Sequence, residues 1–326
     1  MIYTDIVLGV DIGGTNTKLG YVDRQGRCLA DEVMATRSDE PPAIFFRRLH
    51  EQAERLRTTL VPSHRLLGIG IGAPNANYYK GTIEHPPNLS WIWVDIRAEL
   101  SPYYQVPIAA TNDANATALG EMLFGAAQEM RDFIVITLGT GLGSGIVVNG
   151  EMVYGSTGFA GEIGHTIVDP AGRACGCGRR GCLEVYVSAT GLRLTVLELL
   201  ARSDAPSPLR DLAFEELTSK LIFEAARDGD PVALEGFEFT GDLLGRKLAD
   251  AVAYTSPEAI FLFGGLAASG ELLFKPVRRA LEENLLNIYR GTVKLLPSGV
   301  PEGKAAILGA SALIWNELST RQSGNT

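Results

Sequence analysis

Two glycine-tipped hairpins place the strongest constraint on how this chain can fold. The first spans Ile6–Val22 and carries Asp11-Ile12-Gly13-Gly14-Thr15 at its tip. The second spans Phe133–Val148 and carries Gly139–Gly143 at its tip. β-Branched runs interrupted by glycine clusters indicate strands joined by tight turns. Each hairpin is followed by further strand and helix patterns, so the chain should be an α/β protein.

The two hairpins also resemble each other in sequence. Aligning Gly14-Thr15 with Gly139-Thr140 places Gly20 against Gly145 and Val22 against Val147. The match is short, and chance is the alternative to a duplicated α/β domain with a cleft between its copies. A chain of 326 residues is long enough for two lobes. We expect lobes at 1–120 and 121–326, with a C-terminal helix near 304–320 packing back on the first lobe.

Between and after the hairpins, the pattern of apolar residues predicts further elements. A strand at Leu66–Ile71 is followed by an irregular segment rich in Pro, Asn and Trp, then by a strand at Val106–Ala110 and a helix at Ala114–Gly125. From Leu183 onward helical spacing dominates, beginning with Leu183–Ala201. The second lobe should therefore be rich in helices.

Composition narrows the function classes. Apolar residues make up 46% of the chain and charged residues 21%, as in a globular protein, and the formal net charge of −9 disfavours binding to a phosphate backbone. The chain shows neither a basic N-terminal leader nor a run of about eighteen apolar residues that could span a bilayer. We expect a cytoplasmic protein that binds neither nucleic acid nor membrane.

A cluster of cysteines predicts a metal site. His165 precedes Cys175, Cys177 and Cys182, a set of one imidazole and three thiolates that is typical of a closed tetrahedral zinc site. Four protein ligands leave no position for water, so the zinc should brace the loop 165–182 and not catalyse, which disfavours a zinc hydrolase. The alternative is a cysteine cluster without metal. Cys28 stands apart and is interpreted as a small buried hydrophobe.

The hairpin tips are candidate phosphate-binding loops. Asp11-x-Gly13-x-Thr15 offers backbone N–H groups, a hydroxyl and a carboxylate able to hold Mg²⁺ through water, and Lys18 adds positive charge. The Gly139–Gly145 loop offers similar backbone donors. Either loop alone could be an ordinary tight turn. Two such loops at the heads of two similar halves indicate a nucleotide site.

Several polar residues are candidates for chemistry on a sugar. Asp113 lies between a predicted strand and helix, where its carboxylate could accept the proton of an attacking hydroxyl; the alternative for Asn112-Asp113 is a helix N-cap. Glu162 and Glu184 flank the cysteine loop and could each accept two hydroxyl donors, the alternative being surface charge. His165 could bind zinc through one ring nitrogen and face the sugar with the other.

With these motifs in place, the chain resembles kinases of the ROK family (repressors, open reading frames and kinases) over nearly its whole length. Asp11–Thr15 is similar to the family's first phosphate motif, Leu138–Gly145 to its second and Phe263-Gly264-Gly265 to its adenosine motif. The segment from Glu162 to Glu184 resembles the zinc and sugar signature. The resemblance implies two actin-like, RNase H-like lobes with a sugar in the interlobe cleft, MgATP above it, and a homodimer.

The resemblance also assigns roles to residues. It implies Asp113 as general base, and sugar binding by Asn88, Asn112, Glu162, His165 and Glu184. Asn88 is supported by the resemblance alone. Nucleotide binding is implied for Asp11, Gly13, Gly14, Thr15, Lys18, Gly139, Thr140, Gly141, Gly264 and Gly265.

The prediction for function is an ATP-dependent hexose kinase with glucose as the acceptor, using ATP, Mg²⁺ and a structural Zn²⁺. The alternatives are a kinase for mannose, fructose, allose or an N-acetylhexosamine, and a sugar-sensing protein without turnover. One departure bears on substrate: family glucokinases commonly carry glycine after Gly-Ala-Pro, whereas Asn75 follows Gly72-Ala73-Pro74 here. Because the first predicted strand starts within about ten residues of Met1, we expect this chain to lack the N-terminal helix-turn-helix of the family's repressors.

Overall fold

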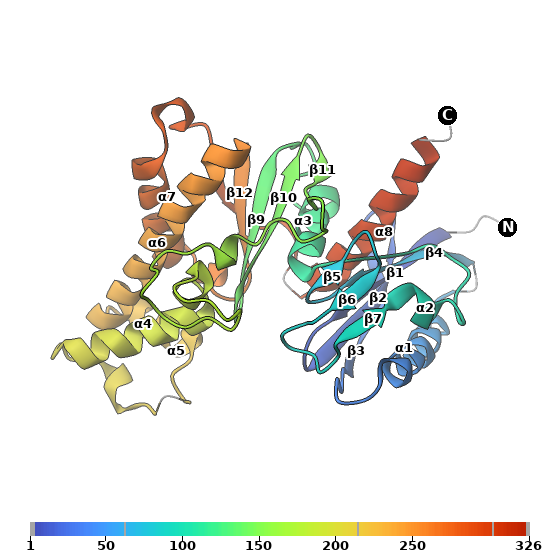
Figure 1. Cartoon of the computed structure of the whole chain (residues 1–326), viewed down its shortest axis with the longest axis horizontal. Helices are drawn as coiled ribbons and strands as arrows, with labels where there is room; N and C mark the ends of the chain where they lie inside the picture. The colour runs from blue at the N-terminus through green and yellow to red at the C-terminus, as the bar shows by residue number, and fades with distance from the viewer. Residues whose placement is uncertain (1–3, 62, 214, 302, 324–326) are drawn as a thin grey trace. The chain divides into compact units, whose positions relative to one another are not determined.

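The protein has a mixed α/β architecture, as the sequence predicted (Figure 1). The computed structural model describes residues 4–61, 63–213, 215–301 and 303–323. The chain divides into two compact units. Unit 1 comprises Met1–Arg131, Gly145–Gly161 and Ser298–Thr326, and unit 2 comprises Asp132–Ser144 and Glu162–Pro297. The lobe boundaries at 1–120 and 121–326 stay a prediction.

Unit 1 is built on a five-stranded sheet with the order β3-β2-β1-β4-β8. Strands β1 to β3 form an antiparallel meander, and β4 and β8 continue the sheet in parallel with β1. The carboxyl ends of β1, β4 and β8 therefore share one edge, where ligands gather in α/β proteins. The strands are β1 (Thr4–Ile12), β2 (Asn16–Asp23), β3 (Cys28–Ala35), β4 (His64–Gly72) and β8 (Ile108–Thr111).

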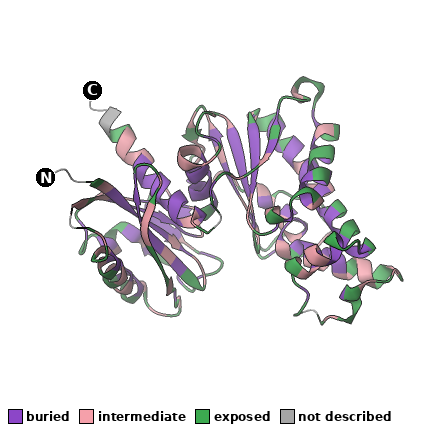
Figure 2. Cartoon of the chain, turned by 180° about the vertical axis from the view of Figure 1, so that it is seen from behind, coloured by how far each residue is buried: buried purple, intermediate pink, exposed green. Residues whose placement is uncertain are grey.

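The two faces of this sheet are covered by different helices. Helix α1 (Pro42–Arg57) begins with proline at its first turn and buries a stripe that includes Phe45, Phe46 and Leu49. These side chains share a core with Ile6, Leu8 and Val10, which are spaced two apart on β1 and so point to one face. The purple strands and helix faces in Figure 2 show how fully this core is buried.

Helix α8 (Ala305–Ser323) packs on the opposite face of the same sheet. Contact is close because the strands carry glycine there: a Cβ built on Gly70 would lie 1.8 Å from the carbonyl oxygen of Ala310, and one built on Gly9 would lie 2.3 Å from Oγ of Ser311. No side chain fits such a gap, so the glycines in these strands set how near the helix lies. Helix α3 (Asp113–Phe124) packs beside α8.

The Pro-, Asn- and Trp-rich segment, interpreted from the sequence as irregular, contains ordered elements. It forms a small antiparallel sheet with the order β5-β6-β7. A short helix, α2, follows, and Asp95 caps it by accepting the N–H of Ala98 at 2.9 Å. The elements are β5 (Ala76–Asn77), β6 (Thr82–Glu84), β7 (Trp93–Asp95) and α2 (Ile96–Leu100).

The second five-stranded sheet has the order β11-β10-β9-β12-β13. A hairpin at one end and parallel strands at the other repeat the plan of the first sheet, in line with the duplication inferred from the two hairpins. The boundary between the two units falls within β10. The strands are β9 (Phe133–Leu138), β10 (Leu142–Val148), β11 (Glu151–Met152), β12 (Ala259–Phe263) and β13 (Lys294–Pro297).

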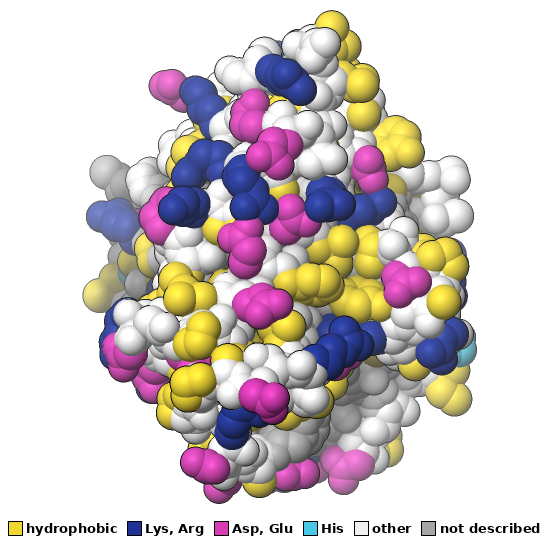
Figure 3. Space-filling model, turned by 90° about the vertical axis from the view of Figure 1, so that its left-hand side faces the viewer, with side chains coloured by type: hydrophobic (Ala, Val, Ile, Leu, Met, Phe, Trp, Pro, Cys, Tyr) yellow, Lys and Arg dark blue, Asp and Glu magenta, His cyan; other side chains and the backbone are white. Residues whose placement is uncertain are grey.

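Most of the remaining chain in unit 2 is helical, and α6 and α7 form its most extensive helix pair. Arg279 on α7 pairs with Glu238 and, at 3.1 Å, with Asp242 on α6. Figure 3 shows basic and acidic side chains side by side on one face of the molecule. None of the described helices combines the length and apolar character needed to cross a membrane. The helices are α4 (Ala189–Arg202), α5 (Ser219–Arg227), α6 (Pro231–Thr255) and α7 (Glu271–Asn284).

Candidate functional site

Two carboxylates meet at the carboxyl edge of the unit 1 sheet. Asp11 lies near the end of β1, and Asp113 begins α3 just after β8. Both lie beside Gly72 at the end of β4: a Cβ built there would be 3.7 Å from Oδ1 of Asp11 and 3.8 Å from Cα of Asp113. Lys18 is the partner of Asp11 across the β1–β2 ladder. The parallel strands thus bring together residues far apart in sequence.

Crowding shifts the acidity of both groups. Burial and, to a smaller extent, the charge of Asp113 raise the pKa of Asp11 to about 7, although the charge of Lys18 works in the opposite direction. Desolvation also raises the pKa of Asp113, although this residue is exposed. A divalent cation at Asp11 would favour the ionised form of its carboxyl group, and a carboxylate oxygen is a ligand that suits Mg²⁺. A raised pKa suits Asp113 to accept a proton near neutral pH.

The helix that carries Asp113 is capped by its neighbour. Asn112 accepts the N–H of Ala114 through its side-chain oxygen at 2.8 Å, so the N-cap alternative holds for Asn112. Asp113 Oδ1 accepts the same N–H at 2.9 Å, which fixes the carboxylate at the start of the helix. The amide nitrogen of Asn112 is not used by the cap and remains a donor for a ligand oxygen.

The first glycine loop lies against Asn88. A Cβ built on Gly14 would lie 2.7 Å from the carbonyl oxygen of Asn88, which places this exposed asparagine beside the loop. The N–H of Gly13 is used in the turn itself, where it donates to Asn16 at 3.1 Å. Within the described part of the chain, the N–H groups of Gly14 and Thr15 have no recorded hydrogen bond and are the donors left for a phosphate.

The second glycine loop, in unit 2, is pinned at several points. Gly139 donates its N–H to Gly141 at 3.0 Å, and Gly143 donates to Oγ1 of Thr137 at 3.2 Å. Thr140 and Gly141 sit at the tip, and among the described residues no acceptor is recorded for their N–H groups. This loop therefore also presents two backbone donors. Thr137 was not singled out from the sequence, because an anchoring threonine inside a strand looks like any β-former.

The adenosine motif lies next to this second loop. Gly264 follows β12 with a φ of 101°, a conformation that favours glycine, and a Cβ there would lie 2.7 Å from the carbonyl oxygen of Leu138. Leu266 donates its N–H to the same carbonyl at 3.2 Å. Because Leu138 directly precedes Gly139, unit 2 brings Gly264 and Gly265 close to the start of the glycine loop.

Glu184 joins the glycine loop to the cysteine loop. Its Oε2 accepts the N–H of Leu142 at 3.0 Å, and its Oε1 lies 3.9 Å from Sγ of Cys175. A Cβ built on Gly141 would lie 2.4 Å from Oε2 of Glu184, so glycine makes room for the carboxylate. The sequence marked Glu184 as a sugar ligand but gave no sign of this contact, which joins residues 42 positions apart.

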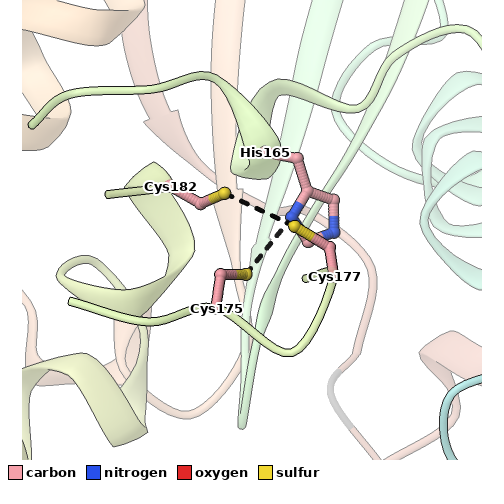
Figure 4. A group of neighbouring side chains, drawn as sticks. All are labelled: His165, Cys175, Cys177 and Cys182. Atoms are coloured by element: carbon pink, nitrogen blue, oxygen red, sulfur yellow. Dashed lines mark hydrogen bonds between the residues drawn. The ribbon is translucent and has the colours of Figure 1, made fainter. Parts of the chain in front are cut away.

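The four predicted zinc ligands converge (Figure 4). Their donor atoms all lie within 4.8 Å of one another. Sγ of Cys177 is 3.6 Å from Sγ of Cys182, and Sγ of Cys175 is 3.7 Å from Nδ1 of His165. Zn–S bonds of about 2.3 Å in a tetrahedron separate the ligand sulfurs by about 3.8 Å. The donor set and its spacing fit a closed zinc site that would hold the loop together.

His165 presents different ring nitrogens to different partners. Nδ1 faces the cysteines, while Nε2 lies 4.0 Å from Oε2 of Glu162. Two residues that the sequence motifs did not mark as functional hold this turn. Ser144 Oγ accepts the N–H of Ile163 at 3.2 Å, and Arg179 donates to the His165 carbonyl at 2.7 Å. Ser144 stands in the glycine motif itself, which was the signal available. Glu162 and His165 therefore form one polar surface.

The candidate residues fall into two groups, one in each unit. Unit 1 brings together Asp11, Gly13, Gly14, Thr15, Lys18, Asn88, Asn112 and Asp113. Unit 2 brings together Gly139, Thr140, Gly141, Glu162, His165, Cys175, Cys177, Cys182, Glu184, Gly264 and Gly265.

Comparison with known proteins places these motifs in a family context. The family model described as ROK family matches residues 7–317. A glucokinase of Thermotoga maritima is 33% identical over 317 residues, which cover 94% of this chain and 96% of that protein. A ROK family glucokinase from Streptomyces griseus, solved in complex with glucose and AMPPNP, is 34% identical with a TM-score of 0.78, over 94% of this chain and 98% of that one.

A regulator is also among the relatives. The xylose repressor of Caldicellulosiruptor bescii is 27% identical over 314 residues, which cover 96% of this chain and 78% of that protein.

Proposed function

This chain belongs to the ROK family, and on that premise we propose that it is an ATP-dependent hexose kinase whose acceptor is D-glucose. The glucokinases of Thermotoga maritima and Streptomyces griseus, both above 30% identity, support a sugar kinase, and the latter was solved with glucose and AMPPNP. The observation that carries the proposal is the pair of acidic residues Asp11 and Asp113, which both lie beside Gly72 and are close enough for the charge of Asp113 to raise the pKa of Asp11. Asp11 is suited to binding a cation, and Asp113 is suited to accepting a proton.

In this proposal Asp113 is the general base. Its carboxylate is fixed at the start of α3, and its raised pKa lets it take the proton of a sugar hydroxyl as that oxygen attacks the γ-phosphoryl group. The bond between the γ-phosphorus and the β,γ-bridging oxygen breaks in the same step, and ADP leaves. Asp11 would hold Mg²⁺ through water, and the bound ion would neutralise charge on the phosphates. Backbone N–H groups of Gly14, Thr15, Thr140 and Gly141 donate to phosphate oxygens.

The sugar is bound by Asn88, Asn112, Glu162, His165 and Glu184 in this proposal. Glu162 and Glu184 accept hydroxyl protons, because an ionised carboxylate has only acceptor sites. Bound zinc would take Nδ1 of His165 and leave Nε2 for a hydroxyl, fixing which ring nitrogen carries the proton. The zinc is proposed as structural, held by His165, Cys175, Cys177 and Cys182. A homodimer and a cytoplasmic location stay predictions.

A sugar-sensing protein without turnover is the second candidate, and the xylose repressor relative is the observation that favours it. The two differ in what they require of the residues. A sensor needs the sugar ligands, whereas only a kinase needs a carboxylate base and phosphate-binding loops as well.

The decisive experiment is a coupled ADP-release assay with MgATP and a panel of glucose, mannose, fructose, allose, N-acetylglucosamine and N-acetylmannosamine, with zinc measured on the same sample. We expect glucose to give the highest kcat/KM and about one zinc per chain. A different preferred sugar would correct the acceptor but keep the kinase. Sugar binding by calorimetry without ADP release on any sugar would replace the kinase with the sensor.

A further inference from the structure

A small polar pocket in unit 1 is lined by two arginines that belong to none of the motifs above. Its volume is about 140 Å³. Arg97 comes from α2 and Arg321 from the last turn of α8, and Tyr78, Tyr79 and Glu317 complete the polar wall. Ile108 and Ala109 of β8 lie in the same pocket, at the opposite end of the strand from Asp113.

Arg97 is held in place by a neutral carbonyl oxygen, which does not neutralise its positive charge. Its Nε donates to the carbonyl oxygen of Ile108 at 3.4 Å, and a Cβ built on Gly81 would lie only 3.1 Å from the same nitrogen. The stem is therefore fixed against Gly81, while the terminal pair of nitrogens forms the fork that matches phosphate oxygens. An arginine ordered in advance loses less conformational entropy when it binds an anion.

Among the described residues, Arg321 has no carboxylate partner. Neither Arg97 nor Arg321 forms an ion pair with any residue that the structure describes. Glu317 lies one turn before Arg321 on α8, the spacing of a common helix ion pair. Its Oε1 instead accepts the hydroxyl proton of Tyr78. The pocket wall thus carries two positive charges and one negative charge that already has a hydrogen-bond donor.

The size of the pocket limits its ligand. A buried water needs about 10–15 Å³ by the same measure, so the pocket has room for several waters or for one compact polyatomic anion. Typical sites for larger organic ligands measure about 300–1,000 Å³. Two arginines and the hydroxyl of Tyr79 offer the hydrogen-bond donors that a tetrahedral dianion requires.

We propose that the pocket lined by Arg97 and Arg321 is a binding site for a phosphate group. The group could be free inorganic phosphate or the phosphate of a monoester whose remainder extends into solvent. Both have the same charge and oxygen geometry, and the pocket encloses only that part. The pocket shares no residue with either glycine loop, and the proposal does not depend on the kinase activity.

Isothermal titration calorimetry with inorganic phosphate tests the proposal on the wild-type chain and on Arg97→Gln and Arg321→Gln. Both arginines are exposed, so we expect the variants to fold. Each should weaken phosphate binding by about tenfold, the size of one charge-assisted contact. Arg290→Gln is the matched control, because it removes one exposed positive charge in unit 2 and should leave phosphate affinity unchanged.

A second arm uses glucose 6-phosphate and separates the two sources. Monoester binding that Arg97→Gln and Arg321→Gln weaken belongs to the pocket, whereas monoester binding that both variants retain occurs elsewhere. If the two arginine variants lose affinity for inorganic phosphate alone, the ligand is the free anion. If they also lose affinity for glucose 6-phosphate, the ligand is a phosphomonoester. The proposal is overturned if neither compound binds the wild-type chain, or if all three variants bind both compounds as tightly as wild type does.

Discussion

The two groups of candidate residues are held in place by different means. In unit 1, Asp11 and Asp113 lie at the ends of parallel strands, and Asn112 fixes the start of α3. In unit 2, Glu162, His165 and Glu184 lie in or beside two short 3₁₀ turns, Ile163–His165 and Leu183–Val185. The first group relies on a hydrogen-bonded sheet, and the second relies on side-chain contacts and a cysteine cluster.

This difference predicts different responses to perturbation. A sheet covered by helices on both faces keeps its geometry when one polar side chain is replaced. Substitutions of polar residues in unit 1 should therefore change the rate of the chemical step and not the fold. Two short turns cannot order themselves by backbone hydrogen bonds alone. Changes in the cysteine loop should therefore act on the order of the whole segment from Glu162 to Glu184 and on the ligands bound there.

Replacing Asp113 tests the unit 1 side with the largest expected effect. Asp113→Asn keeps the size of the side chain and an oxygen that can accept the N–H of Ala114, but the amide cannot take a proton. We expect kcat to fall by roughly 10²–10⁴ while sugar affinity changes little. Steady-state kinetics give the first quantity, and calorimetry with glucose gives the second.

The matched control is Asp204→Asn, which removes an exposed carboxylate in unit 2 and should leave kcat unchanged. A variant at Asp113 that retained near-normal turnover would remove this residue from the role of base. A variant that lost glucose affinity as strongly as turnover would show that Asp113 holds the sugar and not only its proton.

Replacing Cys177 tests the unit 2 side. Cys177→Ala removes one of four candidate zinc ligands, so we expect the metal content to fall well below one per chain. Sugar affinity should drop by about tenfold or more because Glu162 and His165 lose their support. Metal analysis, glucose calorimetry and hydrogen exchange of residues 162–184 measure the three effects.

Cys28→Ala is the control, because Cys28 lies outside the cluster, with its Sγ 3.7 Å from the carbonyl oxygen of Ala30. It should keep zinc, sugar affinity and slow exchange. If Cys177→Ala lost zinc yet bound glucose as tightly as wild type, the cluster would not support the sugar ligands, and the contrast between the two units would fail.

Local patterns predicted much of this architecture. Both hairpins, the helix behind Asp113 and the convergence of His165 with three cysteines follow from glycine turns, strand runs and ligand spacing. The departure at Asn75 also has a local explanation. This residue adopts a φ of 52°, a left-handed conformation that glycine adopts freely and asparagine tolerates, and its side chain donates to the His85 carbonyl at 2.9 Å.

The features that local sequence patterns did not predict depend on contacts between residues far apart in the chain. The helix expected to begin at Leu183 begins at Ala189, because Ser188 caps it by accepting the N–H of Gly191 at 3.0 Å and the preceding residues turn towards the cysteine loop. The short paired strands after Pro74 lack the length that a periodic pattern needs. The contact of Glu184 with Leu142 joins segments whose proximity no local pattern encodes.

The hydrogen bond between Glu184 and Leu142 gives the last prediction, which has the smallest expected effect. It tests whether Glu184, beside the cysteine loop, also holds the second glycine loop in place. Gly141→Ala would bring a methyl group to 2.4 Å from Oε2 of Glu184, so the carboxylate must move and its bond to Leu142 must weaken. We expect affinity for both glucose and AMPPNP to fall by about three- to tenfold, the loss of roughly one hydrogen bond.

Gly176→Ala is the matched control, since a Cβ built at Gly176 meets nothing within 4 Å. It should bind both ligands and zinc as wild type does, although it lies inside the cysteine loop. If Gly141→Ala weakens only AMPPNP, the glycine loop acts alone and Glu184 does not link the two sites. If both ligands weaken together, one carboxylate in unit 2 sets the geometry of the sugar ligands and of the phosphate loop, a dependence for which unit 1 shows no counterpart among its described contacts.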